Sequence, residues 1–235
     1  MSQPSAEAIA KAITDRAVLP AFEGECSLEE AYRLQAEVVA RRAVEGVGGI
    51  KAGVTAPALQ RFFGLEHAVL GSLYADGRLE NGCSIDYVEG RNLECEVAIL
   101  VDGAGLPQAI APSIEVVLLR FARTEDASAA NLVSANVGAD AYIVGEFVDW
   151  DPAFNALRVE LRRGDERLNQ ASLEDALGGP ESGTRWIVGE ARRRGFACEE
   201  GTLLLGGACG TVVPAEPGHY TADYGPLGRL HFEIR

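Results

Sequence analysis

Leu93-Glu94-Cys95-Glu96-Val97-Ala98-Ile99-Leu100-Val101 is the stretch that decides the fold of this chain. Its Val, Ile and Leu residues, and the turn-forming Asp102-Gly103 that follows, predict a β-strand. Residues two apart in a strand point to the same face, so Glu94 and Glu96 project side by side from an apolar element. Adjacent carboxylates beside a core need a cation between them, and hard ions such as Mg²⁺ or Mn²⁺ prefer carboxylate oxygens. The alternative is a solvated strand face, the commoner interpretation of an isolated Glu-x-Glu.

A second apolar strand supplies a third carboxylate. The run from Ser113 to Arg120 is rich in β-branched residues and contains Glu115. If the two strands are neighbours in one sheet, Glu115 can meet Glu94 and Glu96. A carboxyl group buried alone would stay protonated, whereas a role as a third metal ligand would explain why Glu115 lies within an apolar strand. The sequence therefore predicts a three-carboxylate metal site.

Composition excludes several kinds of partner. The 235 residues suit one large domain or two small ones, and the net charge of −14 argues against nucleic acid, which needs a basic patch. No apolar run reaches the roughly 18–20 residues that span a bilayer. The five cysteines are scattered without Cys-x-x-Cys spacing, and the N-terminus lacks the pattern of a secretory signal. We therefore expect a cytoplasmic protein with reduced thiols and no membrane partner.

Lys51 is a candidate catalytic residue. Only two of the 21 lysines and arginines are lysines, Lys11 and Lys51, and Lys51 lies in a short predicted strand between Gly49 and Gly53. A desolvated Lys can lose its proton and Arg effectively cannot. We therefore expect a pocket that lowers the pKa of Lys51, which would donate a proton to a developing negative charge or hold that charge electrostatically. The alternative is a surface strand residue. Asp76, which precedes Gly77 and also fits a plain turn, is a second candidate that would orient the lysine.

Two helices are predicted before these strands. Residues 5–18 show an amphipathic pattern. Ser27 and Glu30 form a capping box at the start of a helix that is expected to run to about Glu45. Neither helix carries candidate catalytic groups, so both are expected to be packing elements.

The motifs follow the order found in a known enzyme group. Residues 49–55 (G-I-K-A-G-V-T) and 71–76 (G-S-L-Y-A-D) resemble the G-x-K-x-G-x-T and G-T-L-F-A-D segments of the 2-keto-4-pentenoate hydratase and 4-oxalocrotonate decarboxylase group, within the fumarylacetoacetate hydrolase superfamily. The Glu-x-Glu strand is similar to the metal strand of that group, residues 114–117 to its L-E-x-V, and residues 201–207 to its G-D-I-I-L-x-G. The ordered matches cover roughly residues 28 to 235.

The resemblance implies a fold and an assembly. The fold is α+β, a strongly curved mixed β-roll of the fumarylacetoacetate hydrolase C-terminal-domain type with N-terminal and flanking helices. Residues 1–48 would form an N-terminal helical cap and residues 49–235 the metal-binding catalytic domain, together making one structural unit. Members of the family usually assemble into oligomers, so the resemblance implies a homo-oligomer, which can also associate with an enzyme of a neighbouring pathway step.

The resemblance also implies roles and a reaction. Mg²⁺ or Mn²⁺ would be bound by Glu94, Glu96 and Glu115. The predicted catalytic residues are Lys51 and Asp76, and the predicted substrate-binding residues are Leu73 and Asn136. A 2-oxo acid can chelate one hard cation through its carboxylate and keto oxygens, which stabilises an enolate as it develops. The expected enzyme is a lyase that hydrates or decarboxylates an unsaturated 2-oxo acid in the catabolism of aromatic or related compounds.

Departures from the group concern the substrate side of the site. Where the group reads A-D-N-A-S-S-G, residues 134–140 read S-A-N-V-G-A-D, so that Ala135 and Gly138 replace Asp and Ser and Asn136 is retained. The loop before Glu115 is also shorter than usual. The metal site is therefore predicted to be intact, while the region that recognises the substrate tail is remodelled.

Two other functions remain open. One is a hydrolase that cleaves an acylpyruvate C–C bond, which needs a water activated by a His-Glu pair, for which Glu66 and His67 are the adjacent candidates. The other is a non-catalytic subunit that supports an active partner. Three retained carboxylates argue against that second alternative, because a scaffold has no need of them.

Overall fold

A long hairpin forms the centre of the molecule, whose computed structural model describes residues 3–235. Its antiparallel strands are β5 (Arg91–Val101) and β6 (Pro107–Leu118). Strand β6 begins at Pro107 rather than at the predicted Ser113, because residues 109–111 continue the pairing with residues 98–100 of β5. The apolar residues around Glu94 and Glu96 thus pair with those around Glu115 in one continuous ladder.

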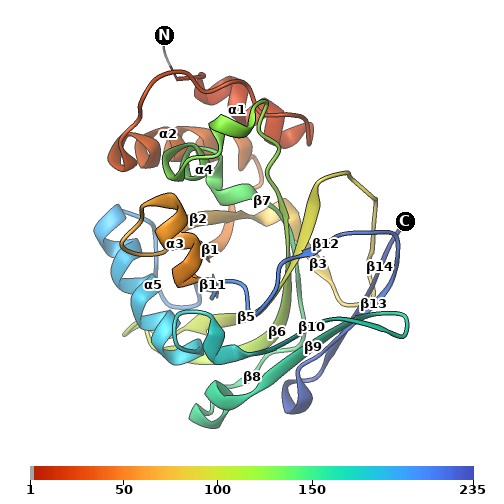
Figure 1. Ribbon diagram of the computed structural model, residues 1–235. Coiled ribbons are helices and arrows are strands. Elements are labelled where there is room, and N and C mark those ends of the chain that lie inside the picture. The colour runs from red at the N-terminus through yellow and green to blue at the C-terminus, as the bar shows by residue number, and fades with distance from the viewer. Residues whose placement is uncertain (1–2) are drawn as a thin grey trace.

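The hairpin belongs to a mixed sheet that curls on itself (Figure 1). Strand β1 pairs with β11 in parallel, as does β3 with β7, and the other neighbours are antiparallel. Strand β2 is the first strand in the pairing order and β7 is next to the last, yet these two strands are in contact. The sheet is therefore strongly curved. In pairing order, the remaining strands of this sheet are β2 (Val69–Tyr74), β1 (Val47–Gly53), β11 (Leu203–Leu205), then past the hairpin β7 (Ala139–Val144) and β3 (Arg78–Glu80), with β12 (Val213–Pro214) on β5 and β8 (Val148–Asp149) on β6.

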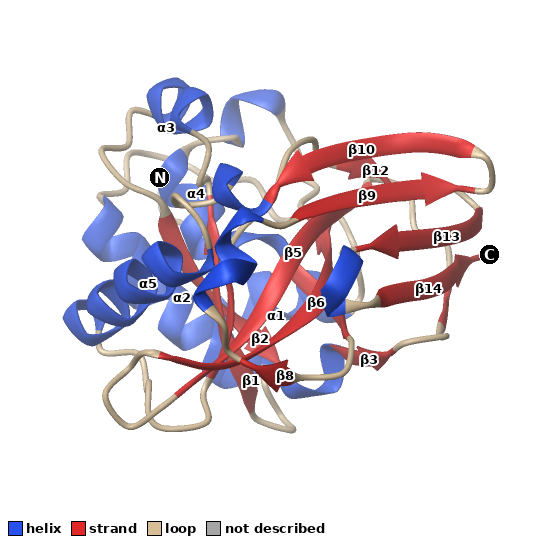
Figure 2. Ribbon diagram, turned by 90° about the horizontal axis from the view of Figure 1, so that it is seen from below, coloured by secondary structure: helices blue, strands red, loops and turns tan. Residues whose placement is uncertain are grey.

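A second sheet covers part of the outer face of the curled sheet. Its strands in order are β10 (Glu166–Ser172), β9 (Arg158–Arg163), β13 (Gly218–Asp223), β14 (Arg229–Ile234) and β4 (Ser84–Ile85). Val97 of β5 belongs to the same buried apolar cluster as Leu161 of β9 and Phe232 of β14. Figure 2 shows this sheet on the side of the molecule away from α2 and α5. In β14, His231 is exposed to solvent, while its neighbours Leu230 and Phe232 are buried.

Helices cover the rest of the curled sheet. They are α1 (Ala6–Thr14), α2 (Leu28–Arg42), α3 (Pro57–Phe63), α4 (Ala129–Ser134) and α5 (Pro180–Arg194). Helices α1, α2 and α4 lie together, as Figure 1 shows. The predicted capping box is present at Ser27 and Glu30. Helix α1 ends at Thr14, short of the predicted residue 18, because Arg16 adopts a left-handed backbone conformation with φ 51°. The observed architecture is the predicted α+β fold with a curved mixed sheet.

The inner face of the curled sheet has an apolar part and a charged part. Leu73, Ala98 and Leu205 pack together in the apolar part. The register places Lys51 opposite Leu205 of β11 and Gly71 of β2, and Glu96 is two residues from Ala98 on β5, so these charged side chains share the same face. The fold thus gathers the candidate residues of four strands onto one concave surface.

Candidate metal centre

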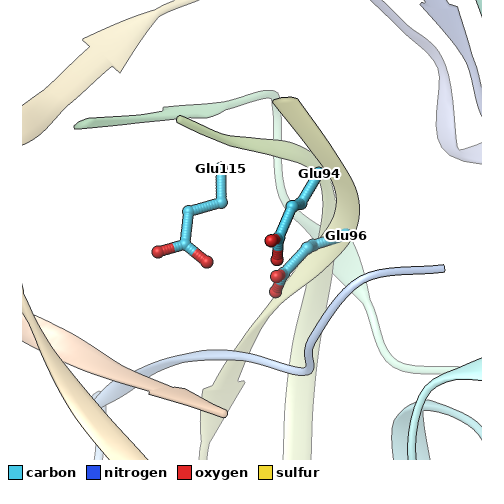
Figure 3. A group of neighbouring side chains, drawn as sticks. All are labelled: Glu94, Glu96 and Glu115. Atoms are coloured by element: carbon cyan, nitrogen blue, oxygen red, sulfur yellow. The ribbon is translucent and has the colours of Figure 1, made fainter. Parts of the chain in front are cut away.

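Three carboxylates converge on the inner face (Figure 3). Glu94 on β5 lies directly opposite Glu115 on β6, and Glu96 follows two residues later on the same face as Glu94. Each residue offers one oxygen, and these oxygens lie within 4.8 Å of one another. The structure therefore brings together the three carboxylates that the sequence singled out, and their role as metal ligands stays a prediction.

The cluster is largely closed to solvent. Glu96 and Glu115 are 0% exposed, whereas Glu94 is half-buried. The backbone N–H of Gly207 donates a 2.8 Å hydrogen bond to Glu96 Oε2. Within residues 3–235, Glu96 Oε1 and Glu115 Oε2 are buried and accept no hydrogen bond. Such oxygens are costly unless they are satisfied, and one hard divalent cation satisfies several carboxylates at once. The donor set therefore fits Mg²⁺ or Mn²⁺.

Burial also changes how tightly the cluster holds protons. Desolvation, together with the negative charges of Glu115 and Glu94, raises the pKa of Glu96 well above its usual value. Desolvation raises the pKa of Glu115 to about 7, although the nearby ammonium of Lys51 opposes the rise. A divalent cation must therefore compete with a proton for these oxygens near neutral pH.

Lys51 faces the cluster from β1. Its side chain is 2% exposed, and Nζ lies 2.6 Å from Glu115 Oε1 in an ion pair. Nζ also donates a 3.1 Å hydrogen bond to the Val137 carbonyl. Burial acts to lower the pKa of Lys51, but the attraction of Glu115, Glu94 and Glu96 outweighs it and the pKa is raised. The expectation of a lowered pKa was wrong, because several carboxylates surround a single ammonium.

The other predicted site residues lie in different surroundings. Asp76 follows β2 in a 3₁₀ turn (Ala75–Gly77), with Oδ2 2.8 Å from Arg42 Nη1. Within the described part of the chain, no hydrogen bond or ion pair joins Asp76 to Lys51. Leu73 is 1% exposed and belongs to the apolar part of the inner face. Their catalytic and substrate-binding roles stay predictions.

Two backbone groups of the site escaped the sequence reasoning. The Val137 carbonyl binds Lys51, and the Gly207 N–H binds Glu96. Backbone donors and acceptors leave no side-chain signature in a sequence. The one available signal was that Gly207 ends the run of residues 201–207 already matched to a family motif.

Comparisons with known proteins test the predicted relationship. The chain is 26% identical over 226 residues to a 4-oxalocrotonate decarboxylase from Pseudomonas sp., which covers 88% of the chain and 86% of the relative. It is 29% identical over 215 residues to the TodF product hydratase of Pseudomonas putida F1, covering 83% and 79%. It is 25% identical over 188 residues to 2-keto-4-pentenoate hydratase 2 of Dechloromonas aromatica, covering 72% and 71%. The chain is a relative of these hydratases and decarboxylases. No family model matches it.

Solved structures share the fold of this chain. The 4-oxalocrotonate decarboxylase from Pseudomonas putida G7, solved with magnesium and adipate, aligns with a TM-score of 0.87 at 21% identity over 98% of the chain and 95% of that protein. The fumarylpyruvate hydrolase from Pseudomonas aeruginosa, solved with Mn²⁺ and pyruvate, aligns with a TM-score of 0.59 at 13% identity, over 79% of the chain and 88% of that protein. The predicted α+β fold with a curved mixed sheet is thereby confirmed.

None of the helices within residues 3–235 is both long and apolar enough to cross a bilayer.

Proposed function

We propose that this protein is a divalent-metal-dependent lyase that hydrates or decarboxylates an unsaturated 2-oxo acid. The observation that carries the proposal is the buried cluster of Glu94, Glu96 and Glu115, with unpaired oxygens, facing the ammonium of Lys51. Curated relatives over most of the chain are hydratases and decarboxylases, which supports the same reaction classes.

The three glutamates would hold Mg²⁺ or Mn²⁺. When bound, such a cation polarises the keto oxygen of a 2-oxo acid and stabilises the negative charge that develops on it. Glu94 is the member with solvent access, so the open side of the cluster lies there. The Gly207 N–H fixes one oxygen of Glu96 and leaves the other free to bind.

Lys51 would hold a proton beside the developing charge. Its Nζ lies 2.6 Å from Glu115 Oε1 and donates a hydrogen bond to the Val137 carbonyl, which are contacts of an ammonium and suit a proton donor or an electrostatic anchor rather than a base. Its counter-charge, Glu115 Oε1, lies 2.6 Å away, so the ammonium is held beside the carboxylate cluster. The apolar surface around Leu73 would exclude water from that side. Asp76 is retained as a weaker catalytic candidate, acting through its contact with Arg42.

The alternative of an acylpyruvate hydrolase gains no support from the residues proposed for it. Glu66 and His67 are both exposed, so they do not form the buried pair that activates a water. A homo-oligomer in the cytoplasm, with a possible pathway neighbour, stays part of the proposal on the strength of the family resemblance. Light scattering of the purified protein would measure the number of chains.

An assay with defined substrates tests the reaction. The purified protein would be incubated with Mg²⁺ and 2-hydroxypenta-2,4-dienoate, 2-oxohex-3-enedioate or acylpyruvates while CO₂ release is followed. We expect turnover of a dienoate or an enedioate, and its loss in Glu96→Gln and Lys51→Met. Glu80→Gln, at an exposed glutamate of β3, is the control and should keep full activity. An unchanged kcat/KM in Lys51→Met, or turnover of acylpyruvates alone, would refute the proposal.

A further inference from the structure

A left-handed corner of the chain lies against the site lysine. Asn136, Val137 and Gly138 have φ values of 52°, 53° and 71° in succession. This conformation is unfavourable for residues with a Cβ, and most unfavourable for a β-branched residue such as Val137. Strained backbone persists only where surrounding contacts hold it, and it is concentrated at functional sites. The contacts that hold this corner therefore indicate what it does.

The side chain of Asn136 fastens the corner to β2. Its Oδ1 accepts a 2.8 Å hydrogen bond from the Ser72 N–H, and its Nδ2 donates a 2.8 Å hydrogen bond to the Ser72 carbonyl. Strand β2 ends the pairing order of its sheet, so these backbone groups lie on the edge away from β1. The amide thus pairs with the edge of β2 as another strand would. Asn136 is 0% exposed, and both ends of its amide are engaged.

Two glycines allow the corner to approach the lysine closely. A Cβ on Gly53 would lie 2.3 Å from Val137 Cγ1. A Cβ on Gly71, the register partner of Lys51, would lie 3.1 Å from the Asn136 carbonyl oxygen and 3.2 Å from Lys51 Cγ. The close packing of the corner therefore explains why residues 53 and 71 are glycines.

We propose that Asn136 is a positioning residue for Lys51: its amide locks the left-handed corner, and the Val137 carbonyl of that corner holds the ammonium. Nζ then lies between this carbonyl, at 3.1 Å, and Glu115 Oε1, at 2.6 Å. Without the hydrogen bonds of Asn136, the Val137 carbonyl is no longer held beside the ammonium. The position of Lys51 Nζ then depends on the carboxylates alone. The inference rests on the proposed function for the importance of Lys51, and it replaces the predicted substrate-binding role of Asn136 by a role through the lysine.

The scarcity of lysine allows a direct test that does not depend on activity. With ¹⁵N at Nζ and ¹³C at Cε of lysine, the NMR spectrum of the intact protein contains signals from Lys11 and Lys51 alone. The Lys11 side chain is 75% exposed, whereas that of Lys51 is buried. Lys11→Arg assigns the two signals. In the unmodified protein we expect a shifted Lys51 signal whose ammonium protons exchange slowly with water.

Replacing Asn136 should release the lysine. Asn136→Gly removes the amide while tolerating the left-handed backbone, and Asn136→Ala removes the amide and strains the backbone as well. Both should move the Lys51 signal toward that of Lys11 and speed its proton exchange. Asn136→Gly keeps the test valid if Asn136→Ala does not fold. Asn131→Ala is the control, because the side chain of this buried asparagine of α4 donates to the Asp126 carbonyl, and within residues 3–235 no hydrogen bond joins that side chain to Asn136, Val137 or Gly138.

Kinetics separate positioning from substrate binding. If a 2-oxo acid is turned over, Asn136→Gly should lower kcat by about a hundredfold with little change in KM, because misplacement of a reacting group is costly. A raised KM with an unchanged Lys51 signal would overturn the proposal in favour of substrate binding. An equal signal shift in Asn131→Ala would also overturn it. If no substrate is turned over, the proposed function fails while the NMR result still decides whether Asn136 positions Lys51.

Discussion

Lys51→Met is expected to lower the free energy of unfolding of the metal-free protein and to strengthen its binding of Mg²⁺. In the metal-free protein Lys51 is the cation at the carboxylate cluster, 2.6 Å from Glu115 Oε1. A divalent ion can bind Glu115 through its unpaired Oε2, but it must then lie close to the like charge of the Lys51 ammonium. Lys51 therefore stabilises the metal-free carboxylate cluster and opposes the binding of a divalent ion.

The two magnitudes follow from burial and charge. Breaking a buried ion pair and leaving one charge behind costs about 3–5 kcal/mol of unfolding free energy. Because Lys51 opposes the rise in the pKa of Glu115, that pKa rises further in Lys51→Met, and a proton then replaces the lost cation. The loss of unfolding free energy should therefore be larger at high pH and shrink as the pH falls. At an effective dielectric constant of about 20, two unit charges about 4 Å apart interact by about 4 kcal/mol. If Lys51→Met relieves a third of such a repulsion between the ammonium and Mg²⁺, the affinity for Mg²⁺ rises about tenfold.

Calorimetry and denaturant unfolding test both parts. Mg²⁺ titrations of Lys51→Met should give a dissociation constant at least about tenfold lower than that of the unmodified protein. Lys11→Met changes the only other lysine, which is exposed, and is the matched control. Equal or weaker Mg²⁺ binding in Lys51→Met, with a folded protein, would refute the reasoning. So would a similar change in Lys11→Met.

Three further results are expected. Ser27→Ala should lower the free energy of unfolding by about 0.5–2 kcal/mol in urea, because it removes the N-cap of α2, and it should leave Mg²⁺ affinity unchanged. Asp140→Asn should lower it by about 3–5 kcal/mol, since the buried guanidinium of Arg91 loses its 2.6 Å partner, and an unchanged melting temperature would contradict this. The pKa of Glu115 lies above that of an unfolded glutamate, so protons compete with metal below pH 7. The rise in melting temperature on adding Mg²⁺ should therefore be larger at pH 8 than at pH 6, and the reverse order would count against the site.

The sequence could predict the parts of the site that local patterns encode. The spacing of Glu94 and Glu96 follows from strand periodicity, and an apolar run around Glu115 is enough to expect a neighbouring strand. The capping box at Ser27 is likewise a local signal. These features depend on residues close in sequence, so they could be deduced without coordinates.

Other features depend on contacts between distant segments. The left-handed conformation of Val137 could not be predicted, because a β-branched residue ordinarily avoids it and Asn136 enforces it through Ser72 of β2. The raised pKa of Lys51 depends on three carboxylates from two other strands. Desolvation alone would lower that pKa, as expected from the sequence, but the surrounding negative charge raises it.

Counting bound Mn²⁺ by electron paramagnetic resonance tests the central claim most directly. The unmodified protein should bind one Mn²⁺ per chain, and Glu96→Gln should bind it far more weakly, because this change removes a charge from the cluster. Glu80→Gln should bind Mn²⁺ as the unmodified protein does. Failure of the unmodified protein to bind Mn²⁺, or equal binding by Glu96→Gln, would contradict the account.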